Sequence, residues 1–166
     1  MNGLQELSFL SEIVLQSKIV LRAGERLKTA NDNLDYIEVW GSIQSILVAT
    51  GNVSKLLWPT VDRHKKRGEE LREILKIENN NLISARVFRN HFEHYDSRIE
   101  EWYDGQGSYI DLAMNPDLFE KSLERIDRGY NSFNNTLIFR GEILNLDEVL
   151  SIIKEILNIC KQHGFN

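Results

Sequence analysis

The sequence predicts a mostly α-helical protein, a helical bundle with a small β-hairpin near residues 135–145. Two observations favour this fold class. Apolar residues recur three and four positions apart over several long segments, as one face of an α-helix requires. Turn-forming residues separate these segments, and short apolar runs typical of strands occur only near the end of the chain. With 166 residues, 42% of them hydrophobic, the chain is expected to form one domain over residues 1–166.

Two long helices are expected at the start of the chain. Apolar residues at helical spacing predict the first over residues 4–27, and turn formers follow it at residues 31–33. Asp35 is placed to cap the second helix, because its carboxylate can accept hydrogen bonds from free backbone N–H groups. The second helix ends before Pro59, and its apolar stripe consists of Trp40, Ile43, Leu47, Val53 and Leu57.

Two further helices are expected in the middle of the chain. The first is short, over residues 69–77, and follows the basic stretch 63–67, which we interpret as a solvated loop between helices. Three asparagines at residues 79–81 then break the pattern. The next helix is predicted over residues 82–103 and stops at the glycine-containing stretch 104–107.

The last third of the chain combines helix and strand signals. Asn115-Pro116-Asp117 has the form of a helix start. Two apolar segments flank Arg140-Gly141, which indicates the hairpin. Asp147 is expected to cap a final helix that ends near Gly164.

The helix predicted over residues 82–103 carries the most informative segment, Arg89-Asn90-His91-Phe92-Glu93-His94. At about 100° per residue, the Arg89 and His94 side chains leave a helix about 140° apart, with Asn90, Glu93 and Ser97 between them. The opposite sector is an apolar stripe of Ala85, Phe88, Phe92, Tyr95, Ile99 and Trp102. We therefore expect one side of this helix to be buried and the other to carry polar chemistry.

Arg89 and His94 are the candidate catalytic residues. The planar, permanently charged guanidinium of an arginine can hold two phosphate oxygens at once. A histidine, with an unperturbed pKa of about 6.5, takes or gives a proton near neutral pH. Asn90 is expected to bind the phosphate or to orient His94. Glu93 and His91 are assigned supporting positions, Glu93 by holding Arg89 in place.

The segment 89–96 resembles the signature helix of the HEPN superfamily (higher eukaryotes and prokaryotes nucleotide-binding), whose motif is Arg, a polar residue and His a few positions later. Residues 54–59 and 67–72 are similar to stretches of bacterial members of that family. The resemblance covers roughly residues 40–103. The roles of the family's motif residues carry over only to Arg89, Asn90 and His94.

The resemblance implies a HEPN-like helical bundle that dimerises so that two copies of the motif face one cleft. It also implies a metal-independent endoribonuclease without a cofactor, often a toxin or defence effector with an antitoxin of nucleotidyltransferase type. A homodimer suits the spacing, because five residues of helix separate Arg89 and His94 by about 7.5 Å of rise. Two-fold symmetry would bring two arginines and two histidines around one strand.

Composition limits the partners that we expect. The formal net charge of −5 argues against a protein that coats nucleic acid, so DNA is not expected and RNA contact must be local. A weak candidate for that contact is the cluster Arg63, Lys65, Lys66 and Arg67. The chain shows no membrane span and no signal-peptide pattern, and Cys160 is its one cysteine, so we expect a cytoplasmic protein.

Three alternative interpretations stay open. In the first, the dimeric bundle is a non-catalytic module that binds a nucleotide or a partner protein. In the second, His91, His94, Glu93 or Asp96 bind a metal ion, although no Glu-x-x-His pair of the di-iron type occurs. In the third, Arg89 and Glu93 form an ordinary ion pair one helical turn apart, and the motif has no chemical role.

Overall fold

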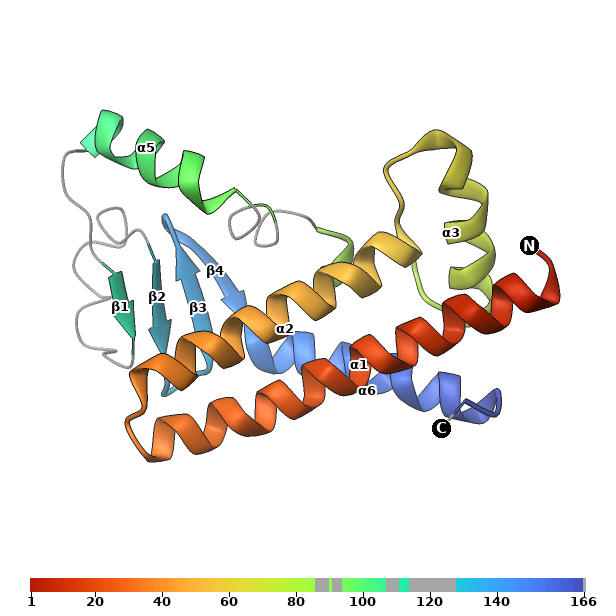
Figure 1. Cartoon of the computed structure of the whole chain (residues 1–166), viewed down its shortest axis with the longest axis horizontal. Helices are drawn as coiled ribbons and strands as arrows, with labels where there is room; N and C mark the ends of the chain where they lie inside the picture. The colour runs from red at the N-terminus through yellow and green to blue at the C-terminus, as the bar shows by residue number, and fades with distance from the viewer. Residues whose placement is uncertain (86–89, 91–93, 107–110, 114–127, 166) are drawn as a thin grey trace.

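The computed structural model describes residues 1–85, 90, 94–106, 111–113 and 128–165, and this part of the chain is mostly helical, as predicted. The elements are α1 (Gly3–Asp32), α2 (Tyr36–Leu57), α3 (Asp62–Ile74), the 3-10 turn η1 (Leu82–Ser84), α5 (Tyr95–Gln106), β1 (Asp111–Ala113), β2 (Arg128–Asn131), β3 (Thr136–Phe139), β4 (Glu142–Asn145) and α6 (Leu146–Gln162). The long helices α1, α2 and α6 run together, with the sheet at one end and α3 at the other (Figure 1).

Helix α1 is longer than predicted. It begins with a capping box, in which the Asn2 side chain accepts a hydrogen bond from the backbone N–H of Gln5 and the Gln5 side chain accepts one from the Asn2 backbone. The turn expected at residues 31–33 lies slightly later, at Asn33 and Leu34, because α1 continues to Asp32. The Asn31 amide donates to the Tyr130 hydroxyl of β2 at 2.9 Å, and this tertiary contact holds the last turn of the helix.

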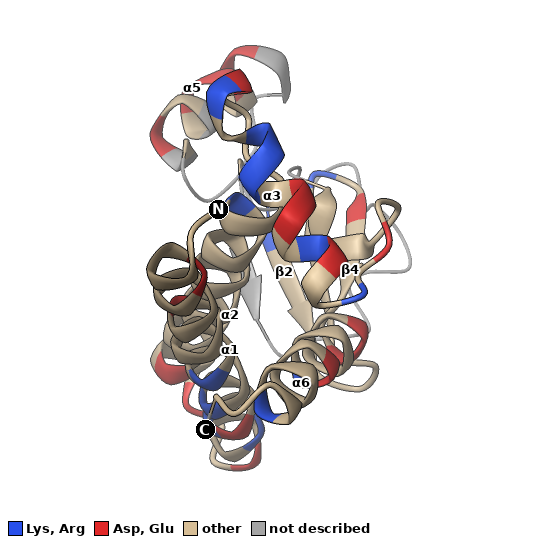
Figure 2. Cartoon of the chain, turned by 90° about the vertical axis from the view of Figure 1, so that its right-hand side faces the viewer, with Lys and Arg blue, Asp and Glu red and all other residues tan. Residues whose placement is uncertain are grey.

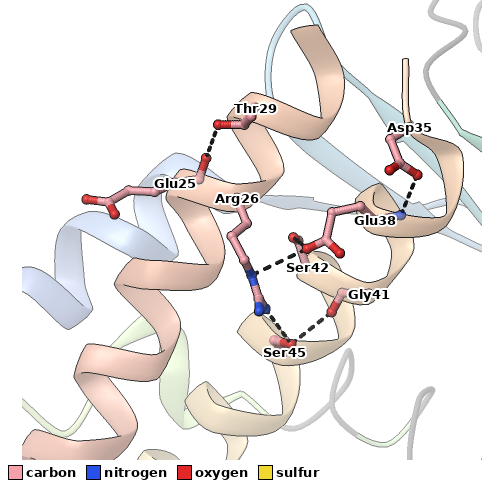
Figure 3. A network of polar contacts seen from close by, with 8 residues as sticks. All are labelled: Glu25, Arg26, Thr29, Asp35, Glu38, Gly41, Ser42 and Ser45. Atoms are coloured by element: carbon pink, nitrogen blue, oxygen red, sulfur yellow. Dashed lines mark hydrogen bonds and ion pairs between the residues drawn. The ribbon is translucent and has the colours of Figure 1, made fainter. Parts of the chain in front are cut away.

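Helix α2 begins where the sequence predicted. The backbone N–H of Glu38 donates to the Asp35 carboxylate at 3.0 Å, which confirms Asp35 as the N-cap. A polar network then ties α2 to α1 (Figure 3). Arg26 lies 3.4 Å from the Glu38 carboxylate and donates to the Ser45 hydroxyl at 3.2 Å. Since Arg26 and Glu38 are about half exposed, the network orients the two helices more than it stabilises them.

The hydrophobic core lies between α1, α2 and α6. The whole predicted stripe of α2 is buried, and it meets Leu10, Ile13, Val20 and Leu27 of α1 and Val149, Ile153, Ile156 and Leu157 of α6. Gly24 lies where α1 packs closely against α6, because a Cβ there would lie 2.8 Å from the Leu150 side chain.

Helix α3 overturns one sequence prediction. The basic stretch 63–67 is helical and is not a loop, and the helix spans Asp62–Ile74 where residues 69–77 were expected. The apolar pattern in the sequence of this helix is weak, because only Gly68 and Leu71 of α3 are buried. What fixes α3 is packing, since Gly68 lies directly against Pro59 and the end of α2.

The predicted hairpin is present. Strands β3 and β4 pair antiparallel with Phe139 opposite Glu142, and the turn between them has positive φ at Arg140 and Gly141. Two strands were not predicted. β2 pairs antiparallel with β3, and β1 pairs parallel with β2, which gives the order β1-β2-β3-β4. Both are four residues or shorter and lack an alternating apolar pattern.

The cap of helix α6 was predicted at the wrong residue. Asn145 is the N-cap, and its side chain accepts from the backbone N–H groups of Asp147 at 2.9 Å and Glu148 at 3.3 Å. Asp147 instead lies in the first turn, where its carboxylate accepts a hydrogen bond from the Asn135 side chain at 2.7 Å. The helix start expected at residues 115–117 lies outside the described residues.

Candidate functional site

The helix predicted over residues 82–103 is not continuous. Residues Leu82–Ser84 form a 3-10 turn, and Ala85 has extended backbone with φ −66° and ψ 134°. The turn is set by Asn81, whose side chain accepts from the backbone N–H of Ile83 at 3.1 Å, while Ile83 itself is buried. Ala85 therefore does not belong to the apolar stripe. Helix α5 begins only at Tyr95.

Of the five motif residues proposed for the site, the structure describes two, Asn90 and His94. Asn90 is helical, and its carbonyl accepts a hydrogen bond from the His94 backbone N–H at 3.1 Å, so the two residues lie one turn apart. Asn90 is half-buried and His94 is exposed. Arg89, His91 and Glu93 lie outside the described residues. The imidazole of His94 is thus accessible to a ligand at the start of α5.

Contacts with the hairpin hold helix α5 in place. Arg140 lies 3.6 Å from the Glu101 carboxylate, and its guanidinium stands over the Trp102 ring at 5.3 Å. Trp102 is buried, as its position on the apolar stripe predicted, and Ile99 is half-buried. Tyr103 is exposed. The hairpin therefore positions the helix that follows His94.

The basic cluster lies along the first two turns of α3, and its charges are engaged to different degrees. Lys65 pairs with Asp62 at 2.7 Å, and this contact raises the pKa of Lys65 and lowers that of Asp62. Arg63 donates to the His64 ring at 3.2 Å, and Lys66 is exposed. Figure 2 shows these cations together at one part of α3, with carboxylates following them along the helix.

Arg67 has a structural position. It donates to the backbone carbonyls of Lys55 at 3.3 Å and Leu56 at 3.4 Å, and Arg72 donates to the carbonyl of Leu57. The Arg67 guanidinium also lies 4.8 Å from the centre of the Phe9 ring, and burial lowers its pKa. Both arginines thus satisfy the free carbonyls at the end of α2, where positive charge is favoured by the helix dipole.

An apolar pocket of about 360 Å³ was not foreseen from the sequence. It lies between α2, η1, β4 and α6 and is bordered by Ala85, just before the motif. The hydroxyls of Thr50 and Ser54 are buried beside it and have no hydrogen-bond partner among the described residues. The sequence does contain a feature that could have indicated this pocket. One face of an apolar helix carries the small residues Thr50, Gly51 and Ser54.

No three His, Cys, Asp or Glu side chains in the described ranges gather closely enough to bind a metal ion. No helix in that part of the chain has the length and apolar character of a membrane span. Comparison with family models, with curated proteins and with solved structures finds no match to this chain.

Proposed function

We propose that this protein is a metal-independent endoribonuclease of HEPN type. The observation that carries the proposal is the segment Arg89-Asn90-His91-Phe92-Glu93-His94 in a helical protein, with an exposed imidazole one turn after a half-buried amide. A histidine that faces solvent can meet a substrate phosphate. An arginine five positions earlier supplies the permanent positive charge that a phosphate requires.

The reaction is attack of a ribose 2′-oxygen on the adjacent phosphorus. The bond from phosphorus to the 5′-oxygen breaks, the 2′-hydroxyl loses its proton to a base, and the leaving 5′-oxygen gains one. In this proposal His94 carries one of these two protons. Arg89 stabilises the negative charge that builds on the phosphoryl oxygens. Asn90 binds a phosphate oxygen or orients His94.

A homodimer completes the site. Because one chain offers one Arg89 and one His94, a single imidazole would have to serve as both base and acid. A two-fold contact supplies a second imidazole from the partner chain and places two guanidinium groups around one RNA strand. Lys66 and Arg63, exposed on α3, are the remaining cations of the basic cluster that RNA can reach.

The test is cleavage of assorted single-stranded RNAs in the presence of a metal chelator. We expect the wild type to cut and His94→Ala to lose at least about a hundredfold in rate, the usual contribution of a general acid or base. His163→Ala is the matched control, because His163 is also exposed but lies at the end of α6. Equal cleavage by both variants would overturn the assignment.

A biological role as a toxin or defence effector follows from the same proposal. Expression in a bacterial host should then slow growth in the wild type and spare it in Arg89→Ala and His94→Ala. Co-expression of a neighbouring nucleotidyltransferase-type antitoxin should relieve the inhibition. Growth inhibition that persists in both variants contradicts a catalytic cause.

A non-catalytic dimeric module that binds a nucleotide or a partner protein is the second candidate. The net charge of −5 and the internal contacts of Arg67 and Lys65 favour it, because they leave few cations for RNA. This candidate predicts that Arg89→Ala and His94→Ala keep fold and dimer and that no variant, wild type included, cuts RNA.

A further inference from the structure

A polar groove of about 720 Å³ lies between α1 and α6 and ends at the β2–β3 turn. This turn is at the end of the sheet away from α5 (Figure 1), so the groove is separate from His94. Its volume is in the range of pockets that hold small ligands. Lys28 of α1 and Lys154 of α6 line it from opposite helices, and Phe133 lines it from the turn.

A chain of hydrogen bonds fixes the floor of the groove. The Asn31 amide donates to the Tyr130 hydroxyl at 2.9 Å, Tyr130 donates to the Asn135 side chain at 2.8 Å, and Asn135 donates to Asp147 at 2.7 Å. Burial raises the pKa of Tyr130, which keeps the phenol protonated as a donor. Asp147 is exposed in the groove, and beyond the bond from Asn135 its carboxylate has further lone pairs that can accept hydrogen bonds from a ligand.

Phe133 is exposed on a rigid turn. Its side chain is 88% exposed, the largest value among the exposed large hydrophobic residues of the described chain. The turn is fixed on both sides of Phe133, because its backbone N–H donates to the Asn131 side chain at 3.0 Å and the Asn135 carbonyl accepts from Leu146 of α6 at 2.9 Å. An exposed aromatic ring beside a groove is a platform on which a flat ligand can stack.

Charges of both signs line the groove. Within the described residues, Lys28, Lys154 and Glu25 form no ion pair. Two lysines can bind a phosphate. The carboxylates of Glu25 and Asp147 oppose a long polyanion and favour a ligand that also carries hydrogen-bond donors.

We propose that this groove binds a single guanine nucleotide. The base stacks on Phe133, its N1–H and N2 amino donors face the Asp147 carboxylate, and the phosphate lies between Lys28 and Lys154. Guanine is the base whose edge presents two adjacent donors to a carboxylate or amide oxygen. The proposal goes beyond the ribonuclease function and does not depend on it.

The experiment is calorimetric titration of the full chain with GMP, guanosine, AMP and a short single-stranded RNA. We expect saturable binding of GMP, with guanosine and AMP weaker. Phe133→Ala should weaken GMP about tenfold, as loss of a stacking platform does, and should leave the fold intact because the side chain is exposed. Lys154→Gln should weaken GMP and leave guanosine unchanged.

Two controls separate this site from the rest of the protein. Lys161→Gln removes an exposed lysine of the same helix that does not line the groove, and GMP affinity should stay the same. His94→Ala should also leave GMP affinity unchanged, whether or not that variant has lost RNA cleavage. The two proposals can therefore fail separately.

Several outcomes overturn the assignment. Lack of saturable GMP binding at millimolar concentration excludes the site, and equal affinity of Phe133→Ala and wild type excludes the stacking role. AMP binding as tight as GMP rejects the guanine contacts. RNA that binds more tightly than GMP and depends on Phe133 rejects a free nucleotide and makes the groove a surface for an RNA strand.

Discussion

Gly68 lies where α3 crosses the end of α2, and the surrounding backbone leaves no space for a side chain. A Cβ there would lie 2.5 Å from the Pro59 ring and 2.7 Å from the Leu57 carbonyl oxygen. We predict that Gly68→Ala lowers the free energy of unfolding by about 2 kcal/mol, because overpacking outweighs the better helix propensity of alanine. Urea denaturation measures the change.

Gly41 supplies the matched control for this prediction. It also lies within a helix, but the nearest atom to a Cβ at residue 41 is the Glu38 carboxylate at 4.0 Å. Gly41→Ala should raise the free energy of unfolding by about 0.5–1 kcal/mol through helix propensity. Equal effects of the two substitutions would show that α3 does not pack against Pro59 as described.

Individual side chains in the candidate site were predictable in type and only partly in position. The segment from Arg89 to His94 was singled out because those residue types suit a phosphate, and the structure places Asn90 and His94 one turn apart. The groove around Phe133 was missed. Its residues come from three separate parts of the chain, and no local pattern connects Lys28, Phe133 and Lys154.

At the scale of single elements, the start of α2 depends on one carboxylate. We predict that Asp35→Ala lowers the free energy of unfolding by about 1 kcal/mol, because the Glu38 backbone N–H loses its acceptor. Asp32→Ala is the control, since Asp32 is exposed at the end of α1, where a carboxylate opposes the helix dipole. The control should be neutral or slightly stabilising in the same urea titration.

Element boundaries were predicted where a cap is local and missed where a tertiary contact sets them. Asp35 caps α2 through the backbone of Glu38, three residues away, so the sequence was enough to predict where this helix begins. The end of α1 depends on Tyr130 of a distant strand, and α3 depends on packing at Pro59. At the start of α6, Asn145 and Asp147 both fit a capping pattern, so the sequence did not distinguish them. In the structure Asp147 accepts a hydrogen bond from Asn135, and Asn145 caps the helix.

At the scale of the whole molecule, the buried thiol of Cys160 couples stability to alkaline pH. Burial raises its pKa from 9.0 to about 11. Between these values the unfolded chain loses the thiol proton and the folded chain keeps it, so stability should fall as pH rises through this window and be unaffected by this group below pH 9.

The comparison of wild type with Cys160→Ala tests this coupling. The variant is expected to be less stable at neutral pH because it leaves a cavity, but its free energy of unfolding should decline less steeply above pH 9. Tyr130, whose pKa burial also raises, should account for part of the decline that remains. Parallel pH profiles for the two proteins would contradict a protonated, buried thiol.

The sequence by itself determined the helical class, the stripe of α2 and the hairpin at Arg140-Gly141, because these depend on spacing and turn chemistry within short segments. Only the tertiary structure decided the 3-10 turn that ends just before Ala85, the added strands β1 and β2, and the groove between α1 and α6. Their physical cause is contact between residues far apart in the chain, where burial and hydrogen bonding outweigh local preference.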